Sequence, residues 1–141
     1  MTGPRIFELR VSPQGDTDLE VALGQRTNGD TTPRRVVVAN GRALRAVADH
    51  LHAALREAGH RPSELRRTRK APIVLPERAG VRLGLVLLAT KPLRKIRRIE
   101  EISAAVRVMS DDEAYYWFAK CTDPGHGRRA QRAFRDLWSP R

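Results

Sequence analysis

Arginine and lysine are the residues whose type and spacing most suggest a chemical role in this chain. The 141 residues include 27 Lys plus Arg against 16 Asp plus Glu, a formal net charge of +11. Most of the cations gather in three stretches, residues 61–70, 91–98 and 128–141. Arginine carries a planar fork of donors that matches phosphate and carboxylate groups. If the three stretches meet on one face, they form an electrostatic footprint for a nucleic-acid backbone.

The first interpretation of these stretches is therefore a surface that contacts nucleic acid, either DNA or RNA. The predicted contact residues are Arg66, Arg67, Arg69, Lys70, Lys91, Arg94, Lys95, Arg97, Arg98, Arg128, Arg129 and Arg132. Two other interpretations stay open, because basic surfaces serve many purposes. The stretches are solvated helix faces, or they dock on an acidic partner protein without nucleic-acid contact.

Four consecutive aromatic residues, Tyr115 to Phe118, form a second notable feature. Adjacent side chains on a helix point all around its axis, so at least one of these rings should lie near the surface. One interpretation is a helix buried on most sides between other helices. The other is a stacking platform for bases or an anchor for a partner protein. In the second interpretation Tyr115, Tyr116 and Trp117 bind the partner.

Catalytic and metal-binding patterns find little support. On a helix His50 and His52 would point about 200° apart, and Cys121 with His126 lacks further ligands. No serine has a nucleophile-elbow context, and no glycine-rich phosphate loop follows a strand. Glu113 and Lys120 lack the acidic strand residues that would hold a magnesium ion. We expect no enzymatic activity, no metal, no cofactor and no small-molecule substrate.

The elements that position these residues are predicted from the spacing of apolar side chains. Period-2 alternation predicts strands at 5–11 and 18–23, paired as an antiparallel hairpin. A polar loop at 25–33 then leads to a third strand at 34–38. Residues 73–75 are either a brief strand or an extended arm, and one helical turn is expected to begin at Ser63. Helical spacing predicts helices at 41–58, 77–90, 94–108, 111–121 and 127–138.

Local signals support several of these helices. Gly59 stands where a left-handed C-terminal cap is expected. Ser110 and Glu113 have the spacing of a capping box, in which Ser110 accepts from the amide three residues on and Glu113 bonds back. The apolar segment 77–90 is predicted as the central buried helix, because its length and the flanking prolines favour helix. Gly80 and Gly84 weaken that prediction, because each glycine lowers helix stability by about 1 kcal/mol relative to alanine. Their spacing of four residues also suggests close approach of another backbone.

Together these signals predict one α+β domain over residues 1–141. A small N-terminal antiparallel sheet of two to three strands (residues 1–40) packs on a C-terminal bundle of four to five helices (residues 41–141). The single cysteine, Cys121, fits a reducing compartment. No stretch approaches the roughly 18 apolar residues of a membrane span, and residues 1–10 lack a signal-peptide pattern. We expect a cytoplasmic protein without membrane contact.

Residues 109–121, from Met109 through the four aromatic residues to Cys121, resemble the signature of an uncharacterised bacterial family, a domain of unknown function. The resemblance extends to residues 81–83, 91–93 and 127–130, so it covers the C-terminal half well and the N-terminal strands loosely. The resemblance implies a family whose small basic members are encoded beside a large ATPase and a DNA methyltransferase, a neighbourhood that looks like an antiphage defence locus. The resemblance implies an accessory role beside larger protein subunits, and no catalytic residues.

The sequence and the resemblance therefore lead to one expected function and one alternative. The expected function is that of a non-catalytic basic accessory subunit of a bacterial multiprotein defence complex, binding a nucleic-acid backbone. The alternative is a protein–protein adaptor whose basic faces dock on an acidic partner.

Overall fold

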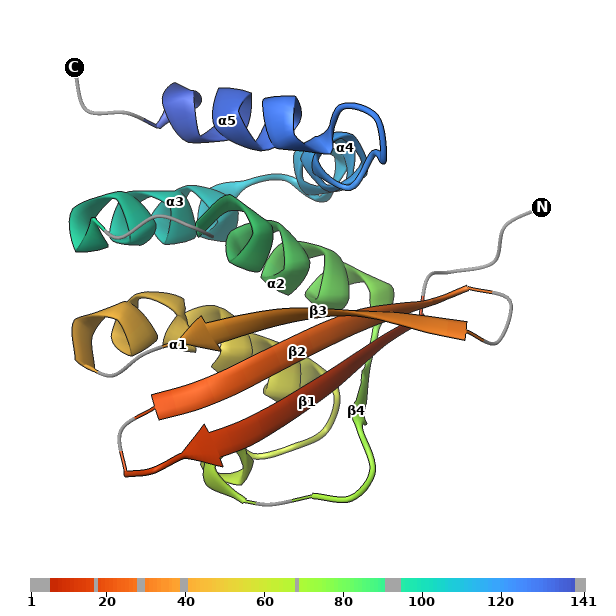
Figure 1. Ribbon diagram of the computed structural model, residues 1–141, viewed down its shortest axis with the longest axis vertical. Helices are drawn as coiled ribbons and strands as arrows, with labels where there is room; N and C mark the ends of the chain where they lie inside the picture. The colour runs from red at the N-terminus through yellow and green to blue at the C-terminus, as the bar shows by residue number, and fades with distance from the viewer. Residues whose placement is uncertain are drawn as a thin grey trace.

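A four-stranded antiparallel sheet forms one layer of the molecule, and helices cover one of its faces (Figure 1). The structure is a computed structural model that describes residues 6–16, 18–27, 30–38, 41–67, 69–90 and 95–138. Along the sheet the strand order is β3-β2-β1-β4. The strands are β1 (Ile6–Gln14), β2 (Asp18–Thr27), β3 (Asp30–Val38) and β4 (Ile73–Leu75).

The predicted hairpin of β1 and β2 is confirmed. Leu9 lies opposite Leu23, and both side chains are buried. Glu8 and Arg10, which alternate with the buried positions, belong to the other face of the sheet. Gly15 occupies the turn with a φ of 72°, a left-handed conformation that glycine adopts without strain. Hydrophobic alternation therefore determines which face of the sheet meets the helices.

The predicted polar loop at 25–33 is wrong at both ends. β2 continues to Thr27 and β3 begins at Asp30, with Gln25 opposite Thr32 in the ladder. Strand pairing to a neighbour outweighs the polar composition of this segment, because strand preference depends strongly on context. Residues 28 and 29 lie outside the described residues. The open question at residues 73–75 is settled, since β4 is a brief strand that pairs with β1.

Helices follow the first three strands, so the predicted α+β class is confirmed. In Figure 1, α1 and α2 lie against the sheet, while α3, α4 and α5 pack on them farther from it. Among the described residues, no helix combines the length and apolar character that a membrane span requires. The helices are α1 (Gly41–Glu57), the short 3₁₀ helix η1 (Pro62–Arg66), α2 (Glu77–Thr90), α3 (Ile96–Val108), α4 (Asp111–Cys121) and α5 (Gly127–Leu137).

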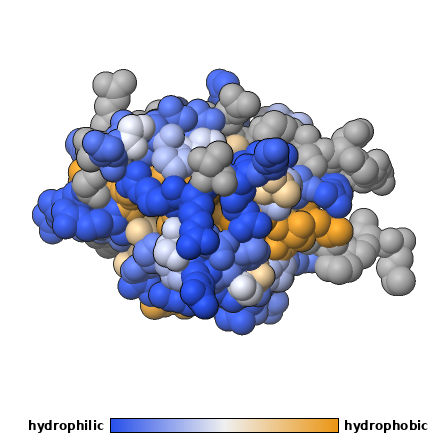
Figure 2. All heavy atoms as spheres, turned by 90° about the horizontal axis from the view of Figure 1, so that it is seen from below, coloured by the Kyte–Doolittle hydropathy of each residue, from blue (hydrophilic) through white to orange (hydrophobic). Residues whose placement is uncertain are grey.

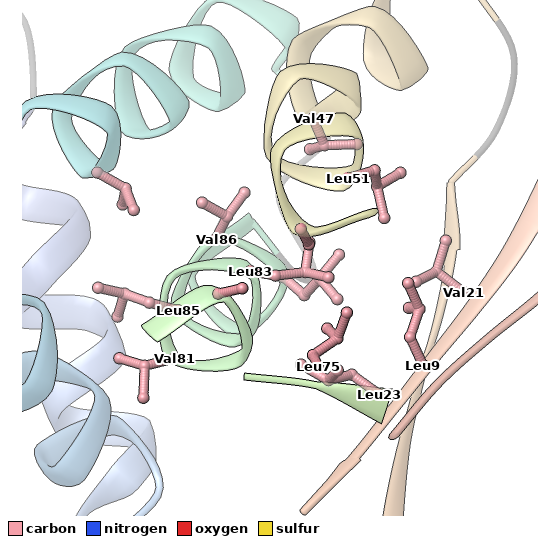
Figure 3. Close-up of a cluster of buried hydrophobic side chains, with 14 of the residues drawn as sticks. Leu9, Val21, Leu23, Val47, Leu51, Leu75, Val81, Leu83, Leu85 and Val86 are labelled. Carbon is pink, nitrogen blue, oxygen red and sulfur yellow. The ribbon is translucent and has the colours of Figure 1, made fainter. Parts of the chain in front are cut away.

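Helix α2 is the centre of the core, as its apolar sequence predicts. It contacts α1, α3, α4, α5 and β1. Figure 3 shows Leu83 turned toward α1 and the strands, while Val81 and Leu85 point to the opposite side, toward the later helices. Burial on nearly all sides explains why the segment reads as uniformly apolar rather than amphipathic.

The two glycines of α2 accept aromatic rings, not the backbone that their spacing suggested. A Cβ on Gly80 would lie 2.2 Å from Cδ2 of Phe7, and one on Gly84 would lie 2.7 Å from Cε2 of Phe118. Phe7 and Phe118 meet edge to face with their centroids 5.6 Å apart. These rings join β1 to α4 across α2, and no side chain larger than hydrogen fits at Gly80 unless Phe7 moves.

Two predicted caps are present. Gly59 has a φ of 82° after α1, and the amide of His60 donates to the carbonyl oxygen of Leu55 (2.8 Å). Ser110 precedes α4, and its Oγ accepts from the amide of Glu113 (3.2 Å). The Glu113 carboxylate accepts from the Ser110 hydroxyl (3.1 Å), whereas the return bond of a capping box would come from the Ser110 amide. The helix boundaries that orient the basic segments are therefore fixed by local hydrogen bonds.

Candidate nucleic-acid interface

The predicted basic residues lie at two ends of the molecule. In Figure 1, η1 and the segment that leads from it to β4 form the lower end, whereas α5 lies at the upper end. The stretch at 61–70 therefore lies at the opposite end of the molecule from α5, so these two stretches do not meet. Lys91 and Arg94 lie outside the described residues.

The lower end carries a basic surface that we call the η1-end surface. Leu65 is buried and anchors η1 in the core. The two residues that follow it, Arg66 and Arg67, are exposed. Figure 2 shows this end of the molecule from below, hydrophilic over most of its area. The cations of the surface are Arg10, Arg61, Arg66, Arg67, Arg69 and Lys70.

Strand pairing adds Arg10 to this surface from a distant part of the sequence. Since β4 pairs with β1, the segment before β4 runs beside Arg10, and Nη1 of Arg10 donates to the carbonyl oxygen of Lys70 (3.2 Å). Nη1 of Arg66 donates to the carbonyl oxygen of Asp18 at the start of β2 (3.4 Å). Sequence reasoning missed Arg10, because its place follows from a β1–β4 pairing that the sequence left open.

One carboxylate within this surface, that of Glu64, already contacts basic side chains of the protein. Oε2 of Glu64 lies 2.6 Å from Nη1 of Arg69 and 2.8 Å from Nδ1 of His60. The His60 hydrogen bond, followed by the nearby charges of His60 and Arg69, lowers the pKa of the Glu64 carboxyl. Arg67 and Lys70 have no acidic partner among the described residues, so their charge is available to a ligand.

A small hollow lies between β1 and the segment from η1 to β4. Its volume is about 60 Å³, and Arg10, Ser12, Glu64, Arg67 and Arg69 are among its lining residues. That space admits one or two water-sized groups, such as the oxygens of a phosphate. The side chains of Arg10, Arg67 and Arg69 thus surround a recess that is about as large as the oxygens of one backbone phosphate require.

The residues predicted at the start of α3 have other contacts. Arg97 pairs with Glu101 one turn along the helix (3.5 Å), and Lys95 is exposed. Nη2 of Arg98 donates to the carbonyl oxygen of Arg135 (3.1 Å), in a partly buried position. At least part of the donor capacity of Arg98 is therefore used within the protein, at the C-terminal end of α5.

Two further arginines, Arg82 and Arg135, also donate hydrogen bonds to carbonyl oxygens at helix ends. Nη1 and Nη2 of Arg82 donate to the carbonyl oxygens of Val106 and Met109 (both 2.7 Å), and Nη2 also contacts Asp111 (2.8 Å). The hydrogen bond from Arg82 is the main cause that lowers the pKa of the Asp111 carboxyl. Nε of Arg135 donates to the carbonyl oxygen of Ala89 at the end of α2 (2.8 Å).

Arg128, Arg129 and Arg132 are exposed on α5, and none forms an ion pair among the described residues. Their surroundings differ from those of the η1-end surface. Residues 111–138 include five Lys or Arg and five Asp or Glu, whereas residues 61–70 include five cations and one carboxylate. Within these two segments, the excess of positive charge is therefore greater at 61–70.

The aromatic cluster mainly joins α4 to α5. Phe118 is buried, and the Trp117 ring packs on Phe134 of α5 with centroids 5.1 Å apart. Tyr115 and Trp117 are partly buried against the core. Tyr116 is 55% exposed, and Nζ of Lys120 lies 5.7 Å from its ring centroid. Of the predicted partner-binding residues, Tyr116 presents the most surface.

Two titratable residues of the core, His50 and Cys121, have shifted pKa values. Within the described residues, no group of three or more His, Cys, Asp or Glu side chains could hold a metal ion. His50 is buried and its Nε2 lies 2.8 Å from the carbonyl oxygen of Ser103, and burial lowers its pKa. Burial raises the pKa of the Cys121 thiol to about 11, so this thiol stays protonated at neutral pH.

Comparison with known proteins identifies a family. No curated protein and no solved structure matches the chain. The model of a family described as a domain of unknown function (DUF7680) matches residues 7–139, which is nearly the whole chain. The chain therefore belongs to the DUF7680 family.

Proposed function

We propose that this protein is a non-catalytic basic accessory subunit that binds the backbone of a nucleic acid through the η1-end surface. The observation that supports this proposal is the exposure of Arg67 and Lys70 without acidic partners among the described residues, beside Arg10 from a distant strand. Phosphate contacts by such cations release condensed counterions, which supplies most of the affinity in sequence-independent binding.

The composition of the surface favours contacts to phosphates over contacts to bases. Residues 61–70 contain no Phe, Tyr or Trp on which bases could stack. Phosphate contacts fix position and orientation but carry no sequence information directly. We therefore expect binding with little sequence preference.

The wider setting of the proposal is a bacterial multiprotein assembly of the antiphage-defence type. This part rests on the resemblance of residues 109–121 and on the gene neighbourhood that the resemblance implies. In such an assembly a larger subunit would supply the chemistry, and this chain would hold the nucleic acid.

A mobility-shift titration with a short DNA duplex and the matching single-stranded RNA tests the proposal. One variant combines Arg66→Ala, Arg67→Ala and Lys70→Ala. A control combines Arg128→Ala, Arg129→Ala and Arg132→Ala and removes the same three charges from α5. We expect the first variant to bind at least about tenfold more weakly than wild type, and the control to stay within about threefold.

Two results would contradict the proposal. The first is the absence of any shift with wild-type protein at low salt. The second is an equal loss in both variants, which would indicate that only total charge matters. The adaptor alternative predicts no shift together with an acidic protein that co-purifies, and the exposed Tyr116 beside Lys120 is the surface that favours it.

A further inference from the structure

A cleft between α1 and α3 has features that the proposed nucleic-acid interface does not use. Its volume is about 420 Å³, within the range of small-molecule sites. It shares no lining residue with the η1-end surface. Among the side chains that line it are Arg42, Arg45, Asp49, Glu100, Ser103 and Arg107.

Two ion pairs bridge the helices along this cleft. Nη2 of Arg42 on α1 lies 2.7 Å from Oε1 of Glu100 on α3. Nη2 of Arg107 on α3 lies 2.6 Å from Oδ2 of Asp49 on α1. Both carboxylates in the cleft are thus neutralised by arginines. Each guanidinium has five N–H donors, so Arg42 and Arg107 retain donors for a further acceptor.

Arg45 is the uncompensated charge of the cleft. On α1 it lies three residues after Arg42 and four before Asp49, so the three share one helix face between the two ion pairs. Arg45 is exposed, and it has no hydrogen bond or ion pair to any described residue. An anion in the middle of the cleft would therefore meet a positive charge that no protein group offsets.

Ser103 lines the cleft from α3, but a ligand there cannot reach its hydroxyl. It lies three residues after Glu100 and four before Arg107, on the α3 face that lines the cleft. Ser103 is only 2% exposed, and its Oγ has no hydrogen-bond partner. The nearby His50 contacts the carbonyl oxygen of Ser103, not the hydroxyl. Because this oxygen atom has almost no accessible surface, Ser103 is not counted among the groups that contact a ligand.

We propose that this cleft binds a small molecule that carries a phosphate or diphosphate group. Arg45 provides the charge, and Arg42 and Arg107 donate from the two ends. Guanidinium forks match phosphate oxygens in both geometry and charge. The sequence did not predict such a ligand, because the cleft forms only when α1 packs on α3.

Isothermal titration of the full chain with pyrophosphate and with inorganic phosphate tests this site, with potassium chloride of equal ionic strength as the blank. The variants are Arg45→Ala and Ser103→Ala. The matched control is Arg56→Ala, an exposed arginine of the same helix that does not line the cleft. We expect saturable binding of pyrophosphate, weakened about tenfold by Arg45→Ala and unchanged by Ser103→Ala and Arg56→Ala.

The absence of saturable binding for both anions would overturn the proposal, and so would equal weakening by Arg45→Ala and Arg56→Ala. Amide chemical shifts give a second readout, because bound pyrophosphate should perturb α1 and α3 rather than η1. If Ser103→Ala fails to fold, Arg45→Ala still decides the outcome, since Arg45 is exposed and has no contact to lose.

Discussion

The arginines at the two ends of this molecule differ in what their guanidinium groups contact. At the lower end, Arg67 extends to solvent without an acidic partner among the described residues. In the helical part, Arg82, Arg98 and Arg135 donate to carbonyl oxygens of other helices. Arg67 thus presents its charge to solvent, whereas Arg82, Arg98 and Arg135 bond to the protein's own backbone, as Arg10 and Arg66 of the lower end also do. Net charge therefore overstates the charge available for binding.

Helix ends explain the second use of arginine. The last four carbonyl groups of a helix have no partner within the helix, and they form the negative end of its dipole. Arg135 contacts the end of α2, Arg82 the end of α3 and Arg98 the end of α5. A guanidinium group satisfies such carbonyls and adds a favourable charge at the same point.

The largest expected effect in this comparison comes from Arg82→Met. The change removes hydrogen bonds to Val106, Met109 and Asp111 and leaves two helix-end carbonyls without a charged donor. We expect the free energy of unfolding to fall by about 3 kcal/mol. Arg78→Met is the matched control, because Arg78 contacts the same Asp111 but its side chain is 60% exposed. Urea denaturation should show a loss of less than about 1 kcal/mol for the control; equal losses would contradict the backbone role.

A smaller effect is expected from Arg135→Met. Arg135 donates one hydrogen bond to Ala89 from a partly buried position, and burial lowers the pKa of its guanidinium. We expect a loss of about 1 to 2 kcal/mol in the free energy of unfolding. Arg132→Met, at an exposed position on the same helix, should change it by less than about 0.5 kcal/mol. Indistinguishable denaturation curves for the two variants would show that the contact to α2 adds nothing.

The smallest expected effect on stability is at the η1-end surface. The combined variant Arg66→Ala, Arg67→Ala and Lys70→Ala should lower the free energy of unfolding by less than about 1 kcal/mol, because all three side chains are exposed. The midpoint of urea denaturation checks this. A large loss would place these residues with the helix-end arginines and would weaken the distinction between the two regions.

Local patterns predicted much of the fold. Alternation around Leu9 and Leu23 predicted the hairpin, and Ser110 and Glu113 marked the start of α4. The longer β2 and β3 were missed, because their hydrogen bonds come from a neighbouring strand and not from the composition of residues 25–33. The role of Gly80 was also missed, since the Phe7 ring that it admits lies 73 residues earlier in the sequence.

The candidate interface was only partly predictable for the same reason. Arg66, Arg67 and Lys70 are near neighbours in the sequence, so their cluster is visible there, whereas Arg10 joins them only through the pairing of β1 with β4. Arg98 was predicted to contact nucleic acid, yet it reaches the carbonyl group of Arg135, 37 residues away. Contacts over such distances depend on how the helices pack, which side-chain spacing does not reveal.

The salt dependence of DNA binding tests the central claim most directly, because the slope of log K against log salt counts phosphate contacts at about 0.9 per contact. We predict that the Arg66→Ala, Arg67→Ala and Lys70→Ala variant has a slope shallower than wild type by about 2 to 3, and that the Arg128→Ala, Arg129→Ala and Arg132→Ala variant keeps the wild-type slope. A reduced slope for the α5 variant, with the wild-type slope retained by the first, would contradict the account.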